Sequence, residues 1–230
     1  MVTLGIHQPT YLPWLGFFKK MMQCDKFVFF DDVQINKKSF HNRNKIRTNT
    51  NWIYLTIPII AGKNTKINEV KIDNTKNWAK KHEKSIIFNY AKAKYFEDYK
   101  KNIELIYGKK YDLLIDLDIE IIEFIMKQLQ IKTKIFRSSE LDIQGQGSER
   151  ILNICKELNT DVYISGTVWA KEHLRLNDFS SNKINVKFQN FIHPKYKQCF
   201  EPFLPNMAAI DLLFNEGENA VNILKNALVN

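Results

Sequence analysis

A late stretch of the chain, in which a helical pattern is followed by a short strand, constrains the fold most. The helix opens near Ser148 and runs to Asn159, and the apolar strand Asp161–Ile164 leads into Ser165 and Gly166. A helix, a short loop, a strand and a glycine turn in this order are typical of an open parallel sheet. We therefore predict an α/β, Rossmann-like fold with a mostly parallel open sheet.

The first thirty residues show a related alternation. Residues 3–7 form a short apolar run, which indicates a buried strand. Pro9 and Pro13 exclude a helix interior from the next segment, whereas residues 14–23 carry apolar side chains at helical spacing. Lys26–Phe30, a run of β-branched and aromatic residues, indicates a second central strand.

The remaining elements are predicted from the same patterns. Further strands are expected at residues 52–58, 66–73, 132–136 and 184–189, and further helices at 78–90, 95–106, 112–129, 207–214 and 219–229. The sequence shows no repeat, low-complexity tract or linker. We therefore expect one α/β domain over residues 1–230, with a helical insertion at about 75–129.

Composition excludes several classes of protein. Hydrophobic residues make up 44% and charged residues 26%, which is ordinary for a folded globular chain. No segment approaches the roughly 20 apolar residues of a membrane helix, and the N-terminus lacks a signal-peptide pattern, so we expect a cytoplasmic protein without membrane insertion. The three cysteines are widely spaced, which argues against disulfides and against a cysteine-based zinc site.

A basic segment, residues 37–47, carries the densest positive charge in a chain whose formal net charge is +9. Arg43, Lys45 and Arg47 alternate, so an extended backbone would direct all three to the same side. Such a row of cations suits a diphosphate or an RNA backbone, and Asn42 adds a hydrogen-bonding amide. The alternative interpretation is a solvated surface loop.

Polar residues follow the predicted strands at the places where α/β proteins bind ligands. His7 and Gln8 follow the first strand, and Asp31, Asp32 and Gln34 follow the second. Ser165 and Gly166 follow the late strand. Because ligands bind outside the C-terminal ends of parallel strands, these residues are predicted to share one site.

The residue types indicate roles at that site. His7 could act as a general acid or base, or donate to a phosphate, and Gln8 could present its amide to a ligand. Asp31 and Asp32 are adjacent, so an extended backbone directs them to opposite faces. One of the two is expected to bind a hydroxyl, an amine or a divalent ion while the other caps a turn. Because the sequence offers no further oxygen ligands, we predict no metal site.

Aromatic residues and later histidines extend the list of candidates. Tyr11 and Trp14 could form an aromatic wall, with core packing as the alternative. His82 is either a ligand contact or an ordinary histidine on a helix surface. A second polar–aromatic cluster follows a later strand and consists of His193, Tyr196 and Gln198. The chain lacks a glycine-rich phosphate loop, a nucleophile elbow and a His-Glu-x-x-His helix, which disfavours hydride transfer and serine hydrolysis.

Several of these blocks together resemble one protein family. The opening block, Ile6-His-Gln-Pro-Thr-Tyr-Leu-Pro-Trp-Leu-Gly-Phe-Phe18, is similar to the opening motif of the WbqC-like family. The resemblance runs almost the full chain and includes Phe29-Phe-Asp-Asp-Val-Gln34, Asn42-Arg-Asn44, Ser165-Gly166, His193-Pro-x-Tyr196-x-Gln198 and Asp211-Leu-Leu-Phe-Asn215-x-Gly217. The chain departs from the family pattern at His173, where a tyrosine is common, and at Ala208 and Ala209, where a serine is found nearby.

The resemblance implies a function in sugar chemistry. The family is bacterial and is associated with gene clusters for O-antigen, lipopolysaccharide and other surface polysaccharides, and its members are associated with glycine transfer to an amino sugar. By resemblance, the chain would be a transferase that joins an amino acid, such as glycine, to the amino group of a nucleotide-linked amino sugar. The donor stays open between a free amino acid with ATP and magnesium and an aminoacyl-tRNA.

The same resemblance gives the candidate residues their expected roles. His7 would be the acid or base, Arg43 and Lys45 would bind anions, and Asp31 or Asp32 would orient the amine or a sugar hydroxyl. The first strand, turn and helix also look like a nucleotidyltransferase-type fold, although the His-x-Gly-His turn of that class is missing. A non-enzymatic basic module that binds RNA, including tRNA, or a sugar nucleotide is the alternative function.

Overall fold

A parallel sheet with helices on both faces forms the centre of the protein. The computed structural model describes residues 1–36, 39–166 and 172–229. Within these ranges, the main sheet has the strand order β7-β2-β1-β8-β9, all parallel, with β1 (Thr3–His7), β2 (Lys26–Phe29), β7 (Lys134–Arg137), β8 (Val162–Gly166) and β9 (Asn185–Gln189). Counted along the chain, this is the order 3-2-1-4-5 of a doubly wound fold. The predicted α/β class with a parallel sheet is confirmed.

The other elements surround this sheet or extend from it. The described helices are α1 (Leu15–Met22), α2 (Trp78–Tyr90), α3 (Phe96–Gly108), α4 (Leu114–Gln128), α5 (Gly147–Glu157), α7 (Leu176–Ser181), α8 (Ile210–Glu216) and α9 (Ala220–Asn226). Two antiparallel ribbons pair β3 (Arg43–Arg47) with β4 (Trp52–Thr56) and β5 (Ile59–Ile60) with β6 (Lys71–Ile72). Short 3-10 turns lie at Ile67–Glu69, Ser138–Glu140 and Gly217–Asn219.

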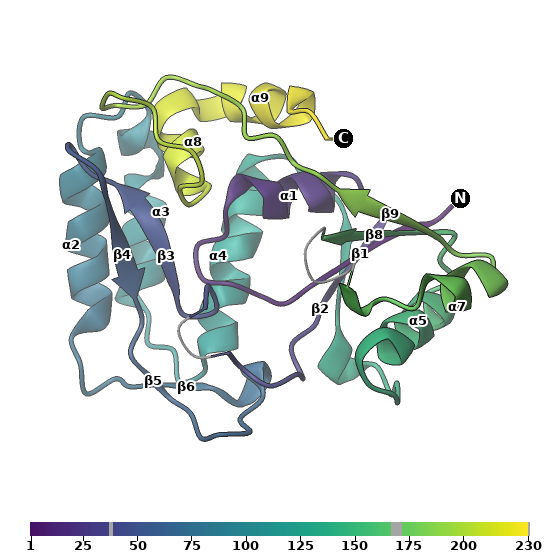
Figure 1. Ribbon diagram of the computed structural model, residues 1–230. Coiled ribbons are helices and arrows are strands. Elements are labelled where there is room, and N and C mark those ends of the chain that lie inside the picture. The colour runs from purple at the N-terminus through teal and green to yellow at the C-terminus, as the bar shows by residue number, and fades with distance from the viewer. Residues whose placement is uncertain (37–38, 167–171, 230) are drawn as a thin grey trace.

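Alternation along the strands divides the core between the two faces of the sheet. Phe27 and Phe29 of β2 pack into a large cluster with α1, α4 and the C-terminal helices, whereas Val28 packs into a smaller cluster with α5 and α7. Figure 1 shows α5 and α7 on one side of the sheet and α1 and α4 on the other. Gly5 leaves room for the Phe27 ring of the neighbouring strand β2, because a β-carbon there would come within 2.7 Å of that ring.

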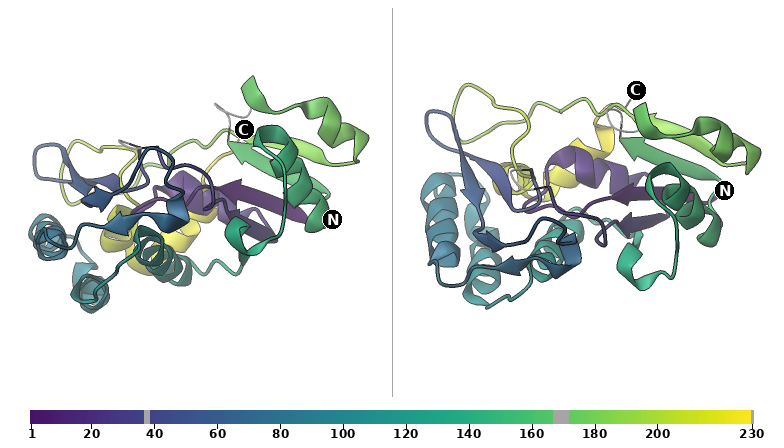
Figure 2. Two further views of the ribbon diagram at one scale, coloured as in Figure 1. Left: turned by 90° about the horizontal axis from the view of Figure 1, so that it is seen from below. Right: turned by 60° about the horizontal axis from the view of Figure 1, so that its bottom comes forward.

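The long connection from β2 to β7 carries the β3–β4 hairpin and the helices α2, α3 and α4. Residues 75–129, the stretch expected to be a helical insertion, contain these three helices. Both views of Figure 2 place the hairpin, α2 and α3 at the end of the molecule opposite α5 and α7. None of the helices in the described ranges is long and apolar enough to cross a membrane.

Several local predictions were wrong. Residues 66–73 do not form one strand, because the Glu69 carboxylate accepts the Lys66 N–H at 3.2 Å and closes a 3-10 turn before the two-residue strand β6. The helix predicted to begin at Met207 begins at Ile210, since Ala208 donates its N–H to the Lys45 carbonyl at 2.9 Å.

Two whole elements and one strand end also differ from prediction. The short helix α7 and the strand β3 were not predicted, and residues 37–38 of the basic segment lie outside the described residues. Ser165 and Gly166 belong to β8 itself rather than to a turn after it.

Candidate functional site

Two neighbouring cavities lie at the C-terminal end of β1. The larger, which we call the main cavity, has a volume of about 570 Å³. It is lined by His7, Gln8 and Trp14, by residues between positions 39 and 45, and by Asn206. The smaller, the side cavity, has a volume of about 180 Å³ and shares His7 and Trp14 with the main cavity. It also reaches Gly166 at the end of β8. Strand order reverses between β1 and β8, so the cavities lie at the topological switch point, where doubly wound proteins bind ligands.

His7 is held in the protonation state that a base requires. Its Nδ1 lies 2.7 Å from the Gln8 carbonyl oxygen, and because a carbonyl only accepts, Nδ1 carries the proton and Nε2 keeps its lone pair. Burial, with a smaller effect from the Lys20 charge, lowers the pKa of His7 from 6.5 to about 4. The imidazole is therefore neutral at pH 7. Its ring meets Phe17 edge-on at 5.1 Å between centroids.

A second histidine, His41, lines the main cavity. Burial lowers its pKa from 6.5 to about 4, and among the described residues its Nδ1 has no hydrogen-bond partner. Asn44 stands beside it and donates from Nδ2 to the Leu12 carbonyl at 2.7 Å, which fixes the turn that carries His7 and Gln8. Sequence reasoning did not select His41 as a site residue, although it noted the polar groups of this segment.

Lys20 is the most unusual residue of the side cavity. Its side chain is only 2% exposed, and its Nζ donates to the Ile6 carbonyl at 2.7 Å. Burial lowers its pKa from 10.5 to about 8, and no acidic side chain in the described part of the chain forms an ion pair with it. Sequence reasoning missed this residue. The signal that could have revealed it is the sequence of α1. Apolar residues lie on every side of this helix, so burying them also buries a lysine.

Asp31 and Asp32 lie at the end of β2, where their carboxylates are already occupied. Asp31 is fully buried and accepts hydrogen bonds from Arg137 Nε at 2.8 Å, from the Ser138 hydroxyl at 3.1 Å and from the N–H and hydroxyl of Ser139 at 2.9 and 2.8 Å. The two aspartates therefore clamp the end of β7 to β2, and neither lines the main or the side cavity.

The partners of Asp32 extend this clamp to α5. Asp32 accepts hydrogen bonds from the Ser138 hydroxyl at 2.5 Å and from Arg150. Burial opposes ionisation, but these bonds outweigh it and hold the pKa of Asp32 below its ordinary value. Arg150 also lies over the Phe30 ring, 5.5 Å from its centroid, so α5 is fixed to the sheet at this point.

Tyr11 and His82 are brought together, but in the core rather than on a cavity wall. The Tyr11 hydroxyl lies 2.9 Å from His82 Nδ1 and also bonds the Tyr107 hydroxyl. Burial raises the pKa values of both tyrosines, and the nearby Asp118 of α4 adds a smaller effect in the same direction. Both carboxyl oxygens of Asp118 are buried without a hydrogen-bond partner in the described structure, and burial raises its pKa well above the usual value. This polar cluster joins the turn after β1 to α2, α3 and α4.

The second polar–aromatic cluster also bonds internally. The Tyr196 hydroxyl donates to Asp211 Oδ2 at 2.7 Å, and Gln198 Nε2 donates to the same oxygen at 2.8 Å. Tyr90 of α2 donates to Asp211 Oδ1 at 2.9 Å. His193 donates from Nδ1 to the Pro194 carbonyl, and burial lowers its pKa. These residues brace the segment after β9 against α8 and α2.

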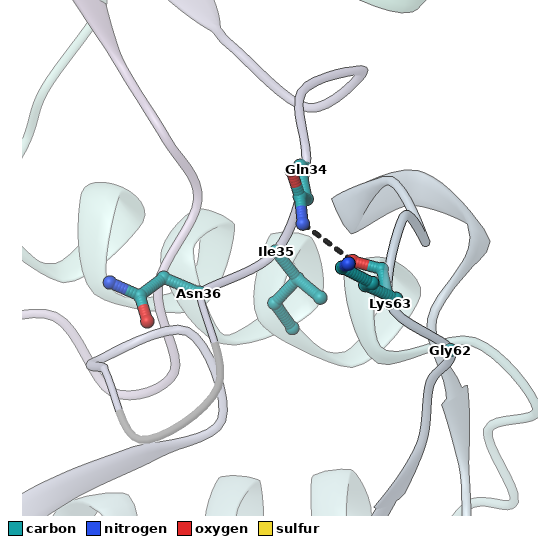
Figure 3. A pocket seen from close by; sticks show the side chains of 5 residues that line it. All are labelled: Gln34, Ile35, Asn36, Gly62 and Lys63. Atoms are coloured by element: carbon teal, nitrogen blue, oxygen red, sulfur yellow. Dashed lines mark hydrogen bonds between the residues drawn. The ribbon is translucent and has the colours of Figure 1, made fainter.

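The other predicted site residues lie apart from the two cavities. Gln34 lines a different cavity of about 630 Å³ with Ile35, Asn36, Gly62 and Lys63, and its Nε2 donates to the Lys63 carbonyl (Figure 3). Asn42 Nδ2 donates to the Ile57 carbonyl at 2.8 Å, and the Ser165 hydroxyl bonds the Tyr163 hydroxyl at 3.2 Å. Both Gln34 and Lys63 are exposed, so this third cavity is a surface hollow.

The outer face of the β3–β4 hairpin pairs cations with aromatic rings. Lys45 Nζ lies 4.2 Å from the Trp52 ring centroid, and the Arg43 guanidinium lies 4.7 Å from that of Tyr54. Arg47 does not continue this row, because it is fully buried and donates to the carbonyls of Thr48, Asn51 and Pro202. The predicted row of three cations is thus reduced to two, of which Lys45 also lines the main cavity.

Comparison with known proteins places the chain in a family. The model of the WbqC-like protein family matches residues 8–223. The chain belongs to the WbqC-like family. It is also 31% identical over 229 residues, 98% of each chain, to the uncharacterized protein Rv1507c of Mycobacterium tuberculosis. No solved structure matches it.

In this WbqC-like protein the blocks that identify the family serve two purposes. The opening block supplies His7, Gln8 and Trp14 to the main cavity, and Lys20 lies two residues after its end. The blocks around Tyr196 and Asp211 form the brace instead. Across the described residues, no group of three or more histidine, cysteine, aspartate or glutamate side chains is arranged to hold a metal ion.

Proposed function

We propose that this WbqC-like protein is an enzyme of surface-polysaccharide synthesis. It forms an amide between an amino acid, such as glycine, and the amino group of a nucleotide-linked sugar. The observation that carries the proposal is the state of His7, a neutral imidazole with its Nε2 lone pair available, in a cavity at the switch point of a doubly wound sheet. Family membership supports the setting in polysaccharide synthesis.

The chemistry needs one proton acceptor and positive charge. A bond forms between the sugar nitrogen and the acyl carbon, and the bond from that carbon to its leaving group breaks; the leaving group is the phosphate or adenylate of glycine activated by ATP, or the ribose oxygen of glycyl-tRNA. One ammonium proton passes to His7 Nε2 and from there to the leaving group, and the second proton is released to solvent as the amide forms. Negative charge that develops on the acyl oxygen and the leaving group is stabilised by nearby cations. Lys20 supplies positive charge in the side cavity, and Lys45 supplies it in the main cavity.

The main cavity suits the sugar nucleotide. Its volume of about 570 Å³ lies within the range of small-molecule sites. Trp14 and Phe40 offer partly exposed aromatic surfaces for the sugar or base, and Lys45 offers charge for a phosphate. Asp31 and Asp32 contribute by positioning, because they fix the ends of the strands beside the cavity.

The test is an amide-forming assay with a matched variant. Purified protein is incubated with a nucleotide-linked amino sugar and either glycine with ATP and magnesium or glycyl-tRNA, and the product mass is measured. His7→Gln is expected to lower kcat at least about 100-fold, whereas His173→Gln, which changes an exposed histidine, leaves it unchanged. RNase treatment that leaves activity intact excludes the tRNA donor. Absence of product with every donor would contradict the proposal.

A second candidate function, non-enzymatic binding of single-stranded RNA, is favoured by the outer face of the hairpin. Trp52 and Tyr54 are 36% and 38% exposed, and each ring faces a cation. Alternating cations and stacking rings are typical of single-strand binding surfaces. A binding module of this kind would lose affinity steeply with salt and on Trp52→Ala, and would be indifferent to His7→Gln.

A further inference from the structure

The side cavity contains a buried positive charge that no acidic side chain among the described residues neutralises. Lys20 lines this cavity, is nearly inaccessible to solvent, and donates to the Ile6 carbonyl at 2.7 Å. The thiol of Cys24 lies nearby but is neutral, because burial raises its pKa to about 12. A buried ammonium without a negative partner is costly unless a ligand supplies one.

The rest of the lining is also arranged for negative charge. Besides Lys20, the wall includes neutral His7, Trp14, the amides of Gln189 and Asn190, and the first turn of α1, and none of its described lining residues carries a carboxylate. The first turn of α1 has no acidic residue and no side-chain cap, and its Phe17 N–H bonds the Trp14 carbonyl at 3.1 Å. The positive end of the helix dipole therefore meets no acidic side chain of its own first turn. Gly16 brings this backbone to the cavity wall.

We propose that the side cavity is a binding site for a small oxyanion, held by the Lys20 ammonium and the N-terminal turn of α1. Its volume of about 180 Å³ equals roughly six water molecules in the liquid, so it holds a carboxylate or a phosphate group but no nucleoside. Inorganic phosphate and the carboxylate of a small amino acid share the required chemistry.

A catalytic use of this oxyanion site rests on the proposed function. The small co-substrate would occupy the side cavity and the sugar nucleotide the main cavity. His7 and Trp14, which line both, would then lie between the reacting groups. The base would stand next to the nitrogen that loses its proton, and Lys20 next to the carboxyl or phosphoryl oxygens.

The site has a defined pH dependence. Oxyanion binding requires the charged form of Lys20, whose pKa is about 8 in the empty site because of burial. Affinity for acetate, which stays ionised in this range, should therefore be constant between about pH 6 and pH 7 and fall by about tenfold per pH unit above pH 8. Neutral His7 and His41 titrate near pH 4, and Cys24 near pH 12, so they do not disturb this window.

The experiment follows the lysine ε-carbons by NMR in full-length protein labelled at that position. Acetate, glycine and inorganic phosphate are titrated separately at pH 7.5. One resonance should shift saturably and titrate at a higher pH when the anion is bound. That resonance should be absent in Lys20→Met and retained in Lys19→Met, the matched control, since Lys19 Nζ instead bonds the Leu224 and Lys225 carbonyls at 3.1 and 2.8 Å.

A second variant keeps the test decisive if Lys20→Met fails to fold. Gln189→Glu places a carboxylate on the wall of the side cavity at the end of the edge strand β9, and should weaken oxyanion binding at least about tenfold while Lys20 is retained. Saturable binding of phosphate alone would assign a phosphate subsite, and binding of acetate and glycine alone a carboxylate subsite. No saturable shift of the Lys20 resonance with any probe overturns the inference.

The failure of this inference and that of the proposed function give different results. Oxyanion binding at Lys20 without amide formation from any donor leaves the site in place and contradicts the function. Amide formation by Lys20→Met with an unchanged KM for the small co-substrate overturns the oxyanion site and leaves the function in place.

Discussion

The indole of Trp14 lies so close over the α-carbon of Gly16 that a β-carbon on Gly16 would stand 2.5 Å from Cζ2 of the ring. The same indole lines both cavities and meets the Phe191 ring edge-on at 5.4 Å between centroids. Glycine at position 16 therefore sets the position of the aromatic wall between the cavities.

Gly16→Ala is expected to displace this wall. Because the methyl group overlaps the indole, the free energy of unfolding should fall by about 1–3 kcal/mol, and KM for the sugar nucleotide should rise. Tryptophan fluorescence, urea unfolding and steady-state kinetics measure the three effects. Gly108→Ala is the control, since a β-carbon there meets nothing within 4 Å. Equal behaviour of the two variants would contradict this interpretation of Trp14.

Because of His7, the decline on the acidic side of the pH–rate profile should lie at unusually low pH. Its pKa is lowered to about 4 by burial, so the base remains neutral well below the pH at which an ordinary histidine becomes protonated. We expect kcat/KM to be flat from pH 7 down to about pH 5 and to decline near pH 4. A decline centred at about pH 6.5 would show that a solvated histidine, rather than His7, limits the reaction.

His41 and His82 should make stability fall in mild acid. Burial lowers both pKa values from 6.5 to about 4, so between these pH values the unfolded chain binds more protons than the folded protein. The free energy of unfolding should therefore be highest above pH 6.5 and should decrease as the pH falls toward 4, by on the order of 2 kcal/mol for each histidine. Urea unfolding at pH 7 and pH 5 tests this. His82→Gln should flatten the dependence, whereas His173→Gln should not.

Asp118 should act in the opposite direction. Burial raises its pKa well above 3.8, so the folded protein keeps the proton that the unfolded chain releases, and stability falls as the pH rises above about 4. Asp118→Asn removes this dependence. The gain in free energy of unfolding over the unsubstituted protein should therefore be about 1–3 kcal/mol larger at pH 7 than at pH 4. Asp116→Asn, an exposed position on the same helix, is the control. A parallel response of the two variants would refute the buried neutral carboxyl.

The brace around Asp211 predicts a structural role for a family motif. Tyr196→Phe removes one hydrogen bond to Asp211 and should lower the free energy of unfolding by about 1 kcal/mol, with KM and kcat unchanged. Calorimetry and kinetics on the same preparation measure both. A large change in KM without a change in stability would instead assign Tyr196 to the substrate.

The sequence predicted the sheet and the location of the cavities because those depend on local patterns. The apolar run before His7 and the helical period of α2 are local signals, and α2 was predicted with its observed bounds. The rule that ligands bind at strand ends then selected His7, Gln8 and Gly166, which line the cavities. Trp14 and Lys45, two further candidates from the sequence, also line the main cavity.

The remaining site residues depend on contacts between distant parts of the chain, to which a single sequence gives no access. Asp31 has the appearance of a ligand residue, but its partner Arg137 is 106 positions away. Tyr196 and Gln198 bond Asp211 rather than a cavity ligand. Lys20 was overlooked because adjacent lysines on one helix are usually solvated, although the apolar residues around α1 indicated a buried lysine; the structure shows that Lys19 and Lys20 are both buried.

The pairing of β1 with two strands from distant parts of the chain bears on how the protein is made. β2 is available to β1 after twenty-odd residues, but Thr3 pairs with Val162 on its other side. A chain emerging from the ribosome therefore carries its most central strand with one edge unpaired until β8 has been synthesised. The cavity walls are completed later still, when Asn206 arrives, so the nascent protein has no finished ligand site for most of its synthesis.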